Sequence, residues 1–153
     1  LKKIIHNVAL KNKNELLYYK IDFKIENVDY MVDTDSKWLE FIINQIVNNS
    51  IKYRDYNKES YILIKAEEVD NIINILVYDN GIGISDSDLP QVFNKCFTGS
   101  NGRDSSSSTG MGLFIVKSLC GKLGHKISIE SRKNVFTLVK ISIAKIEFYD
   151  ALG

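Results

Sequence analysis

Three parts of the sequence, far from one another, could bind a charged small molecule. Asn49 occupies an apolar position of a predicted helix, Asp79 follows a run typical of a strand, and Gly110 and Gly112 precede a helical pattern. A buried amide without a hydrogen-bond partner costs about 1–3 kcal/mol. Asn49 therefore needs a partner, which can be a group of the protein, a ligand or a metal ion.

Each of these groups has a chemistry that suits one part of a nucleotide. The amide oxygen of Asn49 is the kind of hard ligand that Mg²⁺ prefers. The carboxylate of Asp79 can accept a hydrogen bond from an exocyclic amine, such as that of adenine. The N–H groups at the start of the helix that opens near Gly112 can bind phosphates. Lys52, one helical turn beyond Asn49, can reach a phosphate as a point charge.

The segment from Asp79 to Leu113 has the pattern of neither a helix nor a strand along most of its length. It holds most of the chain's nine glycines, the only proline (Pro90) and the serine run Ser105–Ser108. A loop of this length is uncommon inside a compact domain and is usually a lid or a binding loop. Glycines at its ends, such as Gly81 and Gly83, favour backbone that approaches a ligand closely or adopts positive φ.

The composition is that of an ordinary globular domain. The chain has 153 residues, 44% hydrophobic and 25% charged, which predicts one domain with a real core. A net charge of +1 gives no reason to expect a nucleic-acid partner. Cys96 and Cys120 form no paired motif. No apolar run approaches the roughly 20 residues that cross a bilayer, so we expect no membrane contact by this domain. A first residue other than Met fits a fragment of a longer protein, and we expect a cytoplasmic one.

The first third of the chain alternates between helical and strand patterns. Residues 1–19 have helical spacing and predict a helix, or a helical linker from an upstream domain. Residues 20–26 alternate strictly and predict a half-buried strand, with a short second strand at 30–32. Residues 33–35 supply N-cap chemistry for a helix over 36–53. The buried stripe of that helix is predicted at Leu39, Ile42, Ile46, Asn49 and Tyr53.

The remaining elements complete an α+β fold. Strands adjacent in sequence favour antiparallel pairing, and helices then cover one face of the sheet. We therefore predict a two-layer α/β sandwich with a mixed, mostly antiparallel sheet and a long lid, formed by residues 20–145, and a C-terminal tail over 146–153. The further predicted elements are strands over 61–67, 71–78, 126–130 and 135–143, a short helix over 85–93, and a helix over 111–123 that ends at Gly124.

Four short motifs resemble those of the ATPase domain of bacterial sensor histidine kinases, in the GHKL superfamily. They are Asn49–Tyr53 (the N box), Asp79–Ile84 (the G1 box), Val92–Gly99 (the F box) and Gly110–Leu113 (the G2 box). One such motif would be a weak signal, but all four stand in the family's order and on the expected elements. The resemblance covers roughly residues 32–137. It implies the Bergerat-type ATP-binding fold, ATP and Mg²⁺ as cofactors, and transfer of the γ-phosphoryl group to a histidine.

The resemblance also implies a role for each matching residue. Asn49 would ligate Mg²⁺, Lys52 would meet a phosphate, and these two would be the catalytic residues. Asp79 would bind the adenine amine. The other nucleotide-binding residues would be Tyr53, Gly81, Gly83 and Ile84 around the adenine, Thr109, Gly110, Met111, Gly112 and Leu113 at the phosphates, and Arg103 from the lid.

This chain departs from parts of the superfamily in ways that bear on its function. Gyrase, heat-shock chaperones and mismatch-repair ATPases resemble one another in carrying a water-activating glutamate four residues before the N-box asparagine. Here that position is Gln45, and an amide cannot act as a general base. Lys133–Val135 replaces a Gly-Thr pair that the family often has, and Thr137 is left out of the predicted site. His6 lacks the neighbours of a phosphoacceptor motif, and His125 is predicted at a helix–strand junction.

The expected function is that of the ATP-binding catalytic domain of a two-component sensor histidine kinase, whose phosphoacceptor domain is absent from this sequence. Its expected partners are that histidine-bearing domain and a downstream response regulator. The parent protein would be a homodimer anchored in the bacterial membrane. The alternatives are a GHKL-type ATPase, an anti-sigma-factor serine kinase, and a non-catalytic nucleotide-binding module that acts in protein interactions.

Overall fold

The computed structural model describes residues 1–95, 97 and 112–145 of the chain. Its helices are α1 (Lys2–Lys11), α2 (Lys13–Tyr18), α3 (Ser36–Lys52) and α5 (Gly112–Lys122), and a short 3₁₀ helix, η1, spans Leu89–Gln91. Its strands are β1 (Asp22–Glu26), β2 (Tyr61–Val69), β3 (Ile72–Asp79), β4 (Lys126–Arg132) and β5 (Phe136–Ala144). The strands form one sheet in the order β1-β2-β3-β5-β4.

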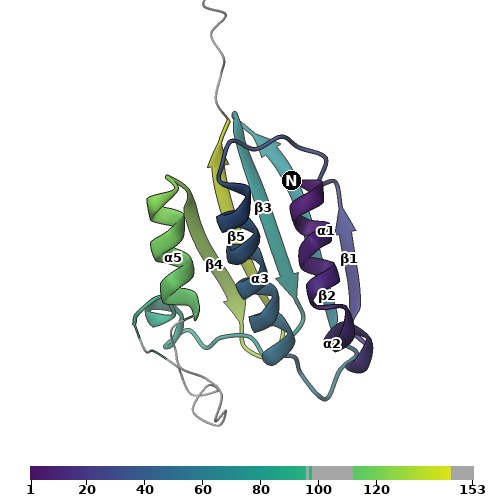
Figure 1. Cartoon of the computed structure of the whole chain (residues 1–153). Coiled ribbons are helices and arrows are strands. Elements are labelled where there is room, and N and C mark those ends of the chain that lie inside the picture. The colour runs from purple at the N-terminus through teal and green to yellow at the C-terminus, as the bar shows by residue number, and fades with distance from the viewer. Residues whose placement is uncertain (96, 98–111, 146–153) are drawn as a thin grey trace, which may run out of the picture.

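The molecule has two layers, with the helices α1, α3 and α5 side by side on one face of the sheet (Figure 1). β1 pairs with β2 in parallel, and every other neighbouring pair in the sheet is antiparallel. This confirms the predicted two-layer α+β sandwich with a mixed, mostly antiparallel sheet. The β2–β3 hairpin closes through Asp70 and Asn71, both with positive φ (52° and 62°), as a tight two-residue turn requires.

The core lies between the helix layer and the sheet. Its fully buried side chains are almost all β-branched or leucine, which suits the sheet strands and the inner face of α3. Burial of such side chains contributes about 1.5–3 kcal/mol each before the entropy of ordering is subtracted. The largest of them are Ile5, Leu39, Ile42, Ile43, Ile46, Ile62, Ile64, Ile73, Ile75, Ile141 and Ile143.

The helix predicted over residues 1–19 is two helices. Asn12 ends α1, and its backbone N–H and side-chain amide both donate to the carbonyl of Val8, at 3.2 and 2.8 Å. α1 contributes Ile4, Ile5 and Val8 to the same core as α3. The segment is therefore packed within the helix layer, while the division of the chain at residues 19 and 145 stays a prediction.

The predicted N-cap of α3 is confirmed, but part of its predicted stripe is wrong. Asp35 accepts hydrogen bonds from the N–H groups of Lys37 and Trp38, at 3.0 and 3.2 Å. Asn49 and Tyr53 are only half-buried. The buried polar residue at this end of the helix is Ser50, which is 5% exposed. α3 is rotated so that residue 50 faces the core and residue 49 lies at its edge.

Two other predicted elements differ from the structure. Residues 30–32 form no strand, since the chain turns through Asn27 with φ 53° and continues as irregular structure to α3. The helix predicted over 85–93 is reduced to η1. The last helix is confirmed: α5 ends at Lys122, Gly124 follows it with φ 77°, and the N–H of His125 bonds back to the carbonyl of Cys120 at 2.8 Å. The predicted tail over 146–153 lies outside the described residues.

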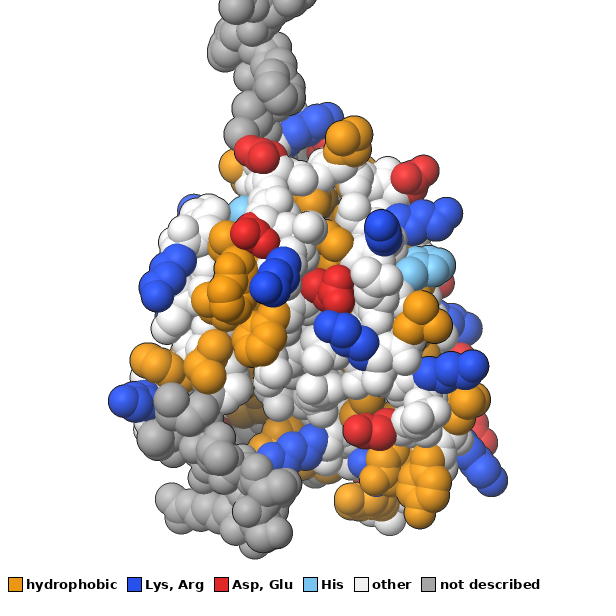
Figure 2. Space-filling model, viewed as in Figure 1, with side chains coloured by type: hydrophobic (Ala, Val, Ile, Leu, Met, Phe, Trp, Pro, Cys, Tyr) orange, Lys and Arg blue, Asp and Glu red, His pale blue; other side chains and the backbone are white. Residues whose placement is uncertain are grey.

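The helix-bearing face carries a group of exposed hydrophobic side chains among charged ones (Figure 2). On α3, Trp38 is 44% exposed, and its ring meets that of Phe41 edge-to-face at 6.1 Å between centroids. Among the described residues, no helix combines the length and the apolar character that a bilayer span requires.

Candidate functional site

The carboxylate of Asp79 lies where the end of β3 meets the end of α3. It is 8% exposed. Its Oδ2 accepts a hydrogen bond from the hydroxyl of Ser50 at 2.8 Å, and its Oδ1 accepts one from the N–H of Gly81 at 2.9 Å. Each oxygen keeps a further lone pair, so the carboxylate can accept another hydrogen bond from a ligand.

Opposing effects act on the pKa of Asp79. Burial raises its pKa to about 6, because removal from water disfavours the ionised form. The N–H of Gly81, the hydroxyl of Ser50 and the positive charge of Lys58 act in the opposite direction. At pH 7.5 the group is therefore mainly ionised, as an acceptor for an exocyclic amine should be.

A row of polar side chains continues across the sheet from Asp79. Thr137 is directly opposite Asp79 on β5, and Ser131 is opposite Thr137 on β4, so the three side chains share one face. The hydroxyls of Ser131 and Thr137 are 3.0 Å apart, and Ser131 Oγ also accepts from the N–H of Ile84 at 2.7 Å. Thr137 thus lies beside the site from which the sequence had excluded it.

Gly81 and Gly83 are needed for close contacts within the chain itself. A β-carbon at Gly81 would collide with the carbonyl oxygen of Tyr53, and one at Gly83 with that of Arg132. Gly83 also has φ 67°, which is strained for any other residue. The G1 segment is thereby packed between the end of α3 on one side and the β4–β5 turn on the other.

A second group of residues lies at the start of α5. A β-carbon at Gly112, the first residue of α5, would be 3.7 Å from Oε1 of Gln45 on α3. The amide of Gln45 therefore faces the end of α5 that presents free N–H groups. Asn49 is one helical turn further along α3. Neither amide makes a side-chain hydrogen bond to any residue in the described part of the chain.

Lys52 and Tyr53 complete the α3 side of the site. Lys52 Nζ lies 5.4 Å from the centre of the Tyr53 ring, and the carbonyl of Tyr53 accepts a hydrogen bond from the N–H of Ile82 at 3.0 Å. Leu113 follows Gly112 in the first turn of α5 and is half-buried. The predicted site residues Arg103, Thr109, Gly110 and Met111 lie outside the described residues.

The histidines lie away from this group. His125 follows the opposite end of α5, and its Nε2 is 2.6 Å from the hydroxyl of Thr34. Burial lowers the pKa of His125, so the neutral form is favoured. His6 is an exposed residue of α1. Neither histidine is placed among the residues that surround Asp79 and Asn49.

Sequence reasoning missed Ser50, Ser131, Thr137 and Lys58. Ser50 directly follows Asn49 in the N box. This position was the only signal in the sequence that could have pointed to Ser50. The positions of Ser131 and Thr137 depend on the register of β4 and β5, which no local pattern specifies.

The family described as "Histidine kinase-, DNA gyrase B-, and HSP90-like ATPase" matches residues 34–145. The chain belongs to this family. It is therefore an ATP-binding domain, and its match begins just before α3 and ends after β5, so the match contains every site residue named above.

Among curated relatives, the chain is 37% identical over 124 residues to sensor protein kinase GraS of Staphylococcus aureus (strain MRSA252). This alignment covers 80% of the chain and 34% of GraS. It is 35% identical over 144 residues to sensor histidine kinase YxdK of Bacillus subtilis (strain 168), covering 93% of the chain and 44% of YxdK. The chain thus spans between about a third and somewhat under half of these relatives.

Solved structures of histidine kinases share the fold. The catalytic domain of histidine kinase ThkA superposes with a TM-score of 0.79 at 24% identity, over 95% of the chain and 92% of that domain. The mycobacterial sensor histidine kinase MprB gives a TM-score of 0.78 at 19% identity, over 94% and 93%.

Proposed function

We propose that this chain is the catalytic domain of a sensor histidine kinase, which binds Mg·ATP and donates the γ-phosphoryl group to a histidine on a separate domain. The observation that carries the proposal is that α3 borders two halves of one site. Through Ser50 it holds Asp79, a carboxylate suited to the adenine amine. Through Gln45 it faces Gly112, where the N–H groups of α5 suit phosphates.

Asn49 lies between these two halves and would hold the metal ion. Its amide has no side-chain hydrogen bond within the described part of the chain, and an amide oxygen is a suitable ligand for a hard cation. Mg²⁺, when held there, would supply positive charge that neutralises the phosphates. Lys52, whose ammonium is on the same end of α3, would add a second positive charge near the phosphates.

The remaining residues would shape the pocket. Tyr53, Gly81, Gly83 and Ile84 would line the adenine, and the row formed by Thr137 and Ser131 supports adding Thr137 to this set. The start of α5, with Gly112 and Leu113, would receive the phosphates. Thr109, Gly110 and Met111 would precede it, and Arg103 would come from the lid.

The residue at position 45 favours the kinase over the ATPases of the same family. The ATPases of this family are similar to one another in having a glutamate at the position that Gln45 occupies here. An amide, unlike a carboxylate, cannot remove a proton from water. The domain would then serve to position and neutralise phosphates while the nucleophile arrives from elsewhere. Neither His6 nor His125 is placed to receive a phosphoryl group, which supports an acceptor outside this chain.

The partners follow from this assignment. The phosphoacceptor domain of the parent protein would supply the histidine, and a response regulator would receive the phosphoryl group next. ThkA has been solved in complex with the response regulator protein TrrA, with a TM-score of 0.76 to this chain. The parent would be a membrane-anchored homodimer, with this domain in the cytoplasm.

A transfer experiment tests the proposal. The chain is mixed with ATP labelled at the γ-phosphate and with the histidine-bearing helical hairpin of the parent protein, and Asn49→Ala serves as a matched control that should transfer far less. We expect label on the hairpin that is labile to acid and stable to base. Acid-stable label would indicate serine phosphorylation, and rapid hydrolysis without transfer would indicate an ATPase. Either result would contradict the proposal.

A further inference from the structure

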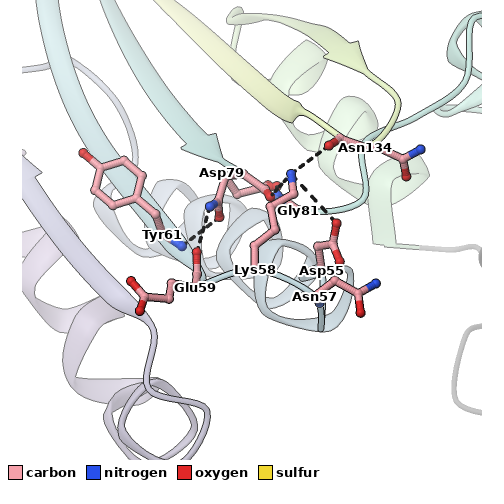
Figure 3. A network of polar contacts seen from close by, with 9 residues as sticks. Asp55, Asn57, Lys58, Glu59, Tyr61, Asp79, Gly81 and Asn134 are labelled. Atoms are coloured by element: carbon pink, nitrogen blue, oxygen red, sulfur yellow. Dashed lines mark hydrogen bonds and ion pairs between the residues drawn. The ribbon is translucent and has the colours of Figure 1, made fainter.

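Lys58 lies in the loop between α3 and β2 and joins three segments that are distant in sequence. Its ammonium donates to the carbonyl oxygen of Asn80 at 3.0 Å and to that of Asn134 at 2.7 Å, and lies 3.9 Å from Oδ2 of Asp55 (Figure 3). Asn80 directly follows Asp79, and Asn134 is in the β4–β5 turn. Two of the three ammonium donors are thus used by backbone carbonyls, and the carboxylate of Asp55 adds an ion pair without a hydrogen bond.

The two carbonyls that Lys58 contacts belong to a closed ring of hydrogen bonds. The N–H of Asn134 donates to the carbonyl of Ile82 at 2.7 Å, so the β4–β5 turn is bound to the G1 segment from a second side. Asn134 has φ 65°, a left-handed conformation that directs both its N–H and its carbonyl to these partners. Lys58 closes the ring by linking Asn134 back to Asn80.

The position of Asn80 is fixed further by its own side chain. Its Oδ1 accepts from the N–H of Tyr61 at 2.8 Å, and its Nδ2 donates to the carbonyl of Glu59 at 2.9 Å. Residues 58–61 therefore hold the backbone just after Asp79 from the outer side, as Figure 3 shows. On the inner side, Asp79 is bound by Ser50 and Gly81.

This arrangement acts on the purine end of the proposed site and not on its phosphate end. The ring of contacts that Lys58 closes includes Asn80 and Ile82. These two residues lie on either side of Gly81 in the G1 segment. The phosphate end, at Gln45 and Gly112, shares no hydrogen bond with it among the described residues. A change in the ring would therefore shift the groups that meet the base and leave the α5 end in place.

We propose that Lys58 is a positioning residue for purine recognition, which holds the G1 segment against the β4–β5 turn so that Asp79 is oriented towards the base. The inference rests on the proposed binding of ATP in this site. It assigns to Lys58 no contact with the nucleotide: the ammonium donates to two carbonyls of the protein and lies 3.9 Å from the carboxylate of Asp55. Its effect is therefore transmitted through Asn80 and Asn134, together with the action of its positive charge on Asp79.

The test is a competition titration of ATP, ADP and adenosine against a fluorescent ATP analogue, with the wild-type chain, Lys58→Met and Lys58→Arg. Loss of two hydrogen bonds from a charged donor should weaken Lys58→Met binding about tenfold, and by the same factor for all three ligands. Lys58→Arg, which keeps the charge and the donors, should recover most of the affinity. Lys145→Met is the matched control, since Lys145 is also in an ion pair, with Glu68 at 3.0 Å, far from the site, and should bind as wild type does.

Each outcome decides the matter. Unchanged affinities in Lys58→Met would overturn the inference. A loss of affinity confined to ATP and ADP would also overturn it, because that result would mean that Lys58 acts on the phosphates. Failure of Lys58→Arg to recover affinity would also count against it. If Lys58→Met does not fold, as judged by its melting curve, Lys58→Gln gives the same comparison of three ligands. A wild-type chain that binds none of them would instead refute the proposed function.

Discussion

Replacement of Asp79 by Asn should make the free domain more stable while weakening its binding of ATP. Burial of the ionised carboxylate is unfavourable in free energy, and it raises the pKa of Asp79 to about 6. Because its pKa is raised by folding, its contribution to stability is present in full below the unfolded value of 3.8 and is lost as the pH rises through about 6. Asparagine fills the same space and carries no charge at any of these pH values.

The magnitude follows from the two pKa values. The rise from 3.8 to about 6 corresponds to ~3 kcal/mol, at about 1.36 kcal/mol for each pKa unit. Part of this is already lost at pH 4, which lies above 3.8, so the wild-type free energy of unfolding should fall by about 2.4 kcal/mol relative to that of Asp79→Asn between pH 4 and pH 7.5. Loss of a hydrogen bond to a charged acceptor should weaken ATP binding by about 10- to 100-fold, equivalent to about 1.5–3 kcal/mol.

Urea denaturation at several pH values measures the first effect. Fluorescence of Trp38, the only tryptophan, reports unfolding. Asp22→Asn is the control, because Asp22 is an exposed carboxylate on β1 and its removal should leave the pH dependence unchanged. A difference between Asp79→Asn and wild type that stays constant from pH 4 to pH 7.5 would refute the reasoning, since it would mean that no buried charge is removed.

Three other substitutions test separate parts of the account. Ser50→Ala removes a hydroxyl that lowers the pKa of Asp79, so ATP should bind several-fold more weakly at pH 7 and recover at higher pH; a loss independent of pH would contradict this. Gly83→Ala should lower the free energy of unfolding by about 2 kcal/mol or more, since φ is 67° there, whereas Gly121→Ala, with open space around it in α5, should raise it by about 1 kcal/mol in the same denaturation assay. Asn49→Ala should weaken ATP binding with Mg²⁺ present and have little effect in EDTA, as measured by calorimetry; an equal loss in both would exclude a metal ligand.

The fold could be predicted from the sequence because its elements have strong local signals. Alternation marked β1, β4 and β5, and apolar runs on either side of a short turn marked β2 and β3. Asp35 marked the start of α3, and Gly124 marked the end of α5. The failures lie where a local pattern has no tertiary support. Residues 30–32 are apolar enough for a strand, yet no neighbouring strand pairs with them, since β1 already forms the edge of the sheet beside β2.

The site was predictable only in part. The family motifs located Asn49, Asp79 and the glycines, but helical spacing alone gave the wrong burial for Asn49. A shift of one residue around α3 places Ser50 against Asp79 instead. Thr137 and Lys58 are placed near Asp79 by strand register and by contacts with carbonyl groups of distant loops, which residue types do not encode.

A crystal structure of the chain with Mg²⁺ and a non-hydrolysable ATP analogue would test the central claim most directly. We expect the adenine amine within hydrogen-bond distance of Asp79, the phosphates at the start of α5 near Gly112, and the amide oxygen of Asn49 bound to Mg²⁺. An analogue that is bound elsewhere, or with its base turned away from Asp79, would contradict the assignment of this site.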